Sequence, residues 1–183
     1  MRIRVFIALL VLLVGRPALA QVPAANPYTK GVRDQFDYVQ NLVLRSAEKI
    51  AEDLYSFKPT SDVRSIAALV GHIADSNNLF CGFAAGKIDV ATAMKDLPTL
   101  QVHEKKTSKA ELIAGLKESG TYCQSVLDGL TDASGQETVL LFGQQPVPKL
   151  LVLTMVTSHG WEHYGNLVTY MRLRGIVPPS SER

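Results

Sequence analysis

The stretch that decides the fold is residues 148–175, which read PKLLVLTMVTSHGWEHYGNLVTYMRLRG. Pro148 suits the start of a helix, because the first turn leaves backbone N–H groups unpaired and proline has none to lose. Gly175 suits its end, and Pro178-Pro179 prevent the helix from continuing. The sequence therefore predicts one long helix from Pro148 to about Arg174.

Three further segments have the pattern of long helices. The first runs from residue 27 to about 57, with apolar residues recurring at intervals of three, four or seven. The second follows Ser65, a residue suited to cap it, and ends at residues 82–86. The third begins at Ser108-Lys109-Ala110-Glu111, a capping box in which hydroxyl and carboxylate each bond a backbone N–H, and runs to about Leu130.

The segments between the helices complete the prediction. Residues 89–97 indicate a short helix that Pro98 ends. Residues 131–148 indicate a loop with a short extended piece at 138–142. Four long helices without strand alternation predict an all-α four-helix bundle, with long connections between the second and third helices and between the third and fourth.

The first twenty residues have the three parts of a secretory signal peptide. Arg2 and Arg4 form a basic start, residues 5–14 are an apolar run, and Ala18-Leu19-Ala20 fits a cleavage site. The alternatives are an uncleaved anchor and an apolar N-terminal core helix. Because the run is shorter than the roughly 20 residues that span a bilayer, we expect cleavage and export to the periplasm or the exterior.

Cleavage of residues 1–20 would leave a single helical domain at residues 21–183. The formal net charge of the chain is +2, and losing three arginines with no acid changes it to −1. A near-neutral domain lacks the basic patch that nucleic acid requires, so we expect no nucleic-acid partner. No later apolar run is long enough to predict stable membrane insertion.

The two cysteines, Cys81 and Cys123, lie on different predicted helices and do not form a C-x-x-C motif. An oxidising compartment would allow them to form a disulfide. The interpretation that we favour from the sequence is that both are small buried apolar residues.

Three of the four histidines form the pattern that carries chemistry. His159 and His163 are one helical turn apart and point from the same stripe, so one helix can offer two nitrogens to one metal ion. His72 lies mid-way along the second helix. Three neutral imidazoles from two helices form a ligand set with open positions. The alternative is three unligated core histidines.

Glu162 and Asp75 are the candidate catalytic residues. Glu162 lies about 60° around the helix from His159, where it could act as a base or orient a ligand; the alternative is a solvent-facing acid. Asp75 lies one turn after His72 and could accept its distal N–H. We expect His103 to be exposed, although it or Asp75 could supply a fourth ligand to a closed structural site.

The segment His159-Gly160-Trp161-Glu162-His163 also matches H-x-x-E-H, the signature of inverzincin peptidases. That class needs a further carboxylate ligand and a much larger scaffold. After His163 the only acid is Glu182, in the terminal tail. The sequence therefore disfavours a peptidase of this class.

Two segments resemble the DinB-like, or YfiT-like, superfamily of metal-binding four-helix bundles: SIAALVGHIAD at residues 65–75 and HGWEHYGNL at residues 159–167. The similarity extends from about residue 27 to 180. It implies that His72, His159 and His163 bind a divalent metal ion, commonly zinc or nickel. It also implies kinship with thiol-dependent S-transferases and a thiol-dependent maleylpyruvate isomerase, and it makes a homodimer plausible.

A metal ion with an open position lowers the pKa of a bound water or thiol and so creates a nucleophile. We therefore expect a metal-dependent hydrolase or thiol S-transferase that acts on a small molecule of unknown identity. The export signal departs from the S-transferase pattern, because thiol cofactors are chiefly cytoplasmic. The alternative function is a non-catalytic bundle that binds a metal ion or a small ligand.

Overall fold

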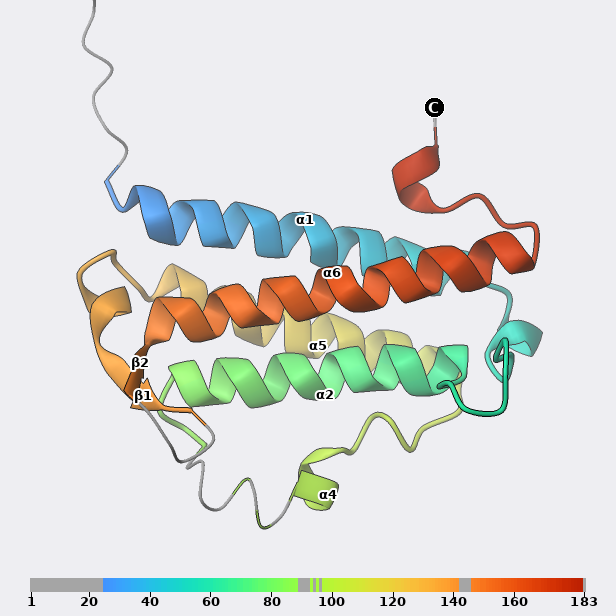
Figure 1. The fold of residues 1–183 in the computed structure, drawn as a ribbon, viewed down its shortest axis with the longest axis horizontal. Coiled ribbons are helices and arrows are strands. Elements are labelled where there is room, and N and C mark those ends of the chain that lie inside the picture. The colour runs from blue at the N-terminus through green and yellow to red at the C-terminus, as the bar shows by residue number, and fades with distance from the viewer. Residues whose placement is uncertain (1–24, 89–92, 94, 96, 142–145, 183) are drawn as a thin grey trace, which may run out of the picture.

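The computed structural model describes residues 25–88, 93, 95, 97–141 and 146–182. Four long helices lie side by side in a bundle (Figure 1): α1 (Pro27–Lys49), α2 (Ile66–Ala84), α5 (Lys109–Asp128) and α6 (Lys149–Leu173). The predicted four-helix bundle is therefore confirmed. The predicted signal peptide lies outside the described residues.

The end of α1 differs from the prediction. The helix ends at Lys49, and Ile50 has an extended backbone. The chain then turns through a short 3-10 helix, η1 (Glu52–Leu54). The hydroxyl of Tyr55 donates a hydrogen bond of 2.6 Å to the carbonyl of Ala47. The apolar spacing in the sequence continues past Lys49 because Ile50 and Tyr55 are also buried in the core. They reach the core from the turn and not from a helix.

The predicted starts of α2, α5 and α6 are correct within a residue, but one predicted cap is wrong. The side chain of Ser65 accepts the backbone N–H of Ala68 at 3.2 Å, as expected. Within the described chain, the side chain of Ser108 makes no capping bond to α5. Glu111 instead lies 4.0 Å from the ammonium group of Lys106. The α6 helix begins directly after Pro148, as expected.

Short elements fill the connections. The helix α4 (Leu97–Leu100) contains Pro98, so this proline does not end a helix, and most of the predicted helix at 89–97 lies outside the described residues. A 3-10 helix, η2 (Ser134–Gln136), precedes strand β1 (Thr138–Leu140), which pairs with β2 (Pro146–Pro148) in an antiparallel hairpin. The predicted extended piece is thus β1, whereas β2 lies in residues that were predicted to be loop. A last 3-10 helix, η3 (Pro179–Ser181), follows α6.

Within the described part of the chain, the buried apolar residues form two clusters along the bundle. One cluster includes Val70, Leu116 and Leu167, and the other includes Phe83 and Val152. Among the described residues, no helix has both the length and the apolar character to cross a membrane.

Cys81 of α2 and Cys123 of α5 form a disulfide within the second cluster, with Cα atoms 5.4 Å apart. The preferred interpretation of two separate apolar side chains is therefore wrong. The bond requires both cysteines to reach the same level of two neighbouring helices, and that register depends on how the helices pack rather than on either local sequence.

Candidate metal centre

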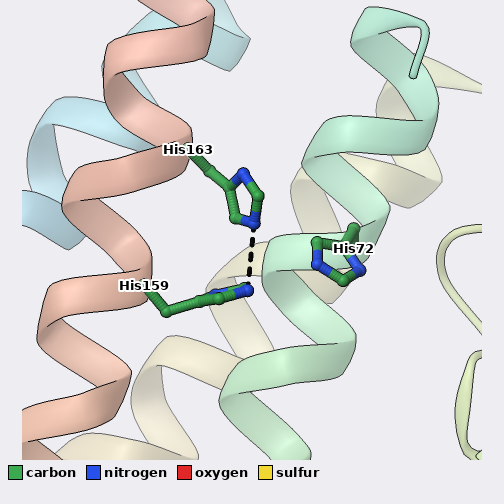
Figure 2. Close-up of side chains that lie close together, drawn as sticks. All are labelled: His72, His159 and His163. Carbon is green, nitrogen blue, oxygen red and sulfur yellow. Dashed lines mark hydrogen bonds between the residues drawn. The ribbon is translucent and has the colours of Figure 1, made fainter. Parts of the chain in front are cut away.

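Three histidine rings from α2 and α6 point toward one another (Figure 2). Each offers one ring nitrogen, and these three nitrogens all lie within 4.8 Å of one another. His159 and His163, one turn apart on α6, bring their Nε2 atoms to 2.9 Å. The ring centroid of His72 lies 5.1 Å from that of His159 and 4.9 Å from that of His163. The structure thus brings the three predicted ligands together.

The spacing of the nitrogens fits a metal ion. Zinc–nitrogen bonds of about 2.0 Å at tetrahedral angles place two ligand nitrogens about 3.3 Å apart. The Nε2 pair on α6 is slightly closer than this at 2.9 Å, and all three nitrogens lie within 4.8 Å of one another, so the rings must turn to place all three on one ion. Imidazole nitrogens suit zinc, nickel and other divalent transition metals.

Burial keeps the three rings neutral. Burial, together with the nearby His163 and His72, lowers the pKa of His159 to about 4. Burial and the neighbouring His72 lower the pKa of His163 to about 4. The pKa of His72 is lowered by burial and by the guanidinium of Arg64, against the opposing effect of Glu104. Neutral imidazole is the form that binds metals.

Glu104 is the partner of His72, a contact that the sequence did not predict. Its carboxylate lies 3.2 Å from Nδ1 of His72 and accepts a hydrogen bond of 2.7 Å from Nε of Arg64. The contact at Nδ1 leaves Nε2 of His72 as the nitrogen for a metal. A carboxylate that accepts a hydrogen bond from the other ring nitrogen of a metal-binding histidine holds the ring in its orientation. Glu104 follows His103 in the connection before α5, where no local pattern marks its contact with α2.

Asp75 has a different role from the expected one. Its buried carboxylate accepts the backbone N–H of His103 at 3.0 Å and that of Glu104 at 2.9 Å. The N–H partner of His72 is therefore Glu104, and the expectation that Asp75 fills this place is wrong. Asp75 instead holds the backbone of residues 103–104 against α2 and so positions Glu104.

Two glycines allow this segment to lie against the bundle. A Cβ atom at Gly71 would come within 2.3 Å of the carbonyl oxygen of His103. A Cβ atom at Gly115 of α5 would come equally close to the His103 ring. The prediction that His103 is exposed is wrong, because its ring packs on Gly115 and is half-buried. It lies outside the cluster of three histidines.

Glu162 is exposed on α6 and faces a cavity of about 550 Å³ beside the cluster. Arg64, His163, Asn166 and Tyr170 also line this cavity. The side-chain amide of Asn166 lies 3.2 Å from Nδ1 of His163, so this ring, like that of His72, has its Nδ1 engaged. The cavity gives a small molecule access to the cluster from the side of His163.

Residues 35–167 match the sequence model of the DinB superfamily. The chain belongs to the DinB superfamily. This DinB-superfamily chain is 30% identical over 139 residues to uncharacterized protein YjoA of Bacillus subtilis, across 74% of the chain and 84% of YjoA. The crystal structure of YjoA superposes with a TM-score of 0.65 at 26% identity, covering 84% of this chain and 99% of YjoA. The predicted family is confirmed.

Two more distant structures share the fold of the DinB-superfamily chain. The mycothiol-dependent maleylpyruvate isomerase matches with a TM-score of 0.63 at 12% identity, across 76% of this chain and 60% of the isomerase. The colibactin self-resistance protein ClbS, solved in complex with a double-stranded DNA, matches with a TM-score of 0.59 at 16% identity, across 83% and 98%. The expectation that this chain binds no nucleic acid stays a prediction.

Proposed function

We propose that this DinB-superfamily protein is an exported metal-dependent enzyme whose metal ion is held by His72, His159 and His163. The observation that carries the proposal is the convergence of three neutral imidazoles, within 4.8 Å, beside a cavity of about 550 Å³. A divalent ion held by three protein ligands supplies Lewis acidity and an open position at which the pKa of a water or thiol is lowered. Zinc or nickel suits this ligand set.

Glu162 and Asp75 have different roles in the proposed reaction. Glu162 faces the cavity, so we assign to its carboxylate the proton that the nucleophile loses. Asp75, the other candidate, has its carboxylate occupied by two backbone N–H groups. We therefore assign to Asp75 the positioning of residues 103–104 rather than proton transfer.

The disulfide and the signal-peptide pattern support export, because stable disulfides form chiefly in oxidising compartments. Thiol cofactors are scarce there, which favours water as the nucleophile and a hydrolase. The second candidate is thiol S-transfer, which the likeness to the mycothiol-dependent isomerase favours. Both reactions would activate their nucleophile, water in one and a thiol in the other, at the same three ligands.

The test is metal content, measured by mass spectrometry on the protein produced without a histidine tag. We expect about one divalent ion per chain and its loss in His159→Ala. Glu162→Gln is the matched control on the same helix: it should keep the metal and lose turnover in a screen of esters, amides and thiols. Metal content in folded His159→Ala equal to that of the parent would reject the proposed centre.

A further inference from the structure

Two cavities of opposite character adjoin the histidine cluster. The larger, of about 550 Å³, touches His163, and the smaller, of about 170 Å³, touches His72 and His159. Because α2 and α6 run in opposite directions, Asn166 and Arg64 lie on one side of the cluster, and Leu79 lies on the other. The cluster therefore stands between the two cavities.

The larger cavity is lined by charged side chains. Glu104 compensates the guanidinium of Arg64 through their 2.7 Å contact. Asp62 and Glu162 add two carboxylates to the same wall. Such a wall suits a polar, hydrated part of a ligand and does not suit an apolar one.

The smaller cavity is mainly apolar. Its apolar lining comes from Leu79 and Phe80 of α2 and from Leu97 and Leu100 of α4, and Asp75, Ser76 and Gln101 line it as well. At about 30 Å³ for a group the size of a water molecule, its 170 Å³ holds an arm of about five or six carbon atoms. An apolar arm placed there would lose contact with water while its polar end reached His72 and His159.

We propose that the substrate is a small amphiphile that spans both cavities. Its reacting polar group lies at the three histidines, its short apolar arm lies between α2 and α4, and its polar remainder lies in the larger cavity. Leu97 and Leu100 then determine the length of the arm. This inference rests on the proposed function and adds to it the substrate class.

The test uses alkyl hydroxamates, simple metal-binding acids, on the full chain loaded with cobalt(II). Affinity is read from the cobalt absorption spectrum. From acetohydroxamate to hexanohydroxamate, we expect affinity to rise about fourfold for each methylene buried. From hexanohydroxamate to octanohydroxamate, we expect it to level off, because the cavity is filled. An affinity independent of chain length, or one that keeps rising past the hexano compound, would overturn the inference.

Variants of the α4 wall locate the arm. Leu100→Trp should fill the cavity and remove the dependence on chain length, while acetohydroxamate still binds. Leu100→Ala should shift the plateau to longer chains. Val102→Trp, at an exposed side chain of the same connection, should change neither. A Leu100→Trp protein with the parent's chain-length dependence would overturn the inference alone, whereas failure to bind cobalt or acetohydroxamate would overturn the proposed function as well.

Discussion

Replacing Glu104 by alanine should weaken metal binding although Glu104 is not a predicted ligand. Its carboxylate contacts Nδ1 of His72 at 3.2 Å, and the two side chains are only 22% and 17% exposed. Removal frees the His72 ring to rotate away from the other two. It also leaves the positive charge of Arg64 uncompensated beside a cation site.

The size of the effect follows from these contacts. Loss of a carboxylate that orients a metal-binding histidine costs about 10- to 100-fold in affinity, or about 1.4 to 2.7 kcal/mol. Since the Glu104 and His72 side chains are mostly buried and Arg64 is left uncompensated, we expect Glu104→Ala near the upper end. Glu104→Gln keeps a hydrogen-bond acceptor but loses the charge, so about tenfold is expected.

The assay is competition for zinc with a chromogenic chelator, with circular dichroism to verify folding. Glu111→Ala is the matched control, because Glu111 is an exposed acid of the neighbouring helix whose ion pair with Lys106 is long, at 4.0 Å. It should leave the affinity unchanged. An affinity of Glu104→Ala within twofold of the parent would refute the reasoning, and so would an equal loss in Glu111→Ala.

Three further predictions concern stability and packing. The double variant Cys81→Ala/Cys123→Ala should lower the free energy of unfolding by about 4 kcal/mol, because the disulfide closes a loop with a sequence separation of 42; urea unfolding measures this, and unchanged stability would contradict it. In the metal-free folded protein, the pKa of His159 and of His163 is about 4, against an ordinary 6.5. Between pH 4 and 6.5 the unfolded chain therefore binds more protons than the folded protein, so the free energy of unfolding should fall as the pH drops from 6.5 to 4. Thermal unfolding in a chelator tests it, and His159→Ala should show a weaker pH dependence. Gly71→Ala should weaken zinc binding, because its Cβ would meet the His103 carbonyl at 2.3 Å and displace residues 103–104; Gly31→Ala, with nothing within 4 Å, should not.

Local sequence patterns were sufficient to predict most of the helices of the bundle and part of the candidate metal centre. The spacing of His159 and His163 on α6 needs only the helical period, so their closeness could be predicted. Placing His72 beside them needed the resemblance to a family, because it depends on how α2 packs against α6. The end of α1 at Lys49 was missed because the turn buries apolar residues at nearly helical spacing.

The parts that could not be predicted depend on contacts between distant segments. Glu104 meets His72 across 32 residues, and Asp75 reaches the amides of the same connection. The disulfide between Cys81 and Cys123 depends on the relative height of two helices. In each case the residue type was visible in the sequence, but the partner was set by tertiary packing.

The segment that runs from α4 to the start of α5 contributes both Leu100, in the wall of the apolar cavity, and Glu104, the partner of His72. The three predicted ligands belong to α2 and α6, outside this segment. Loops accept sequence change far more readily than the helices that they join. Substitutions in this one short segment can therefore change both the ligands that fit the apolar cavity and the affinity of the three histidines for a metal ion. The four helices of the bundle need not change.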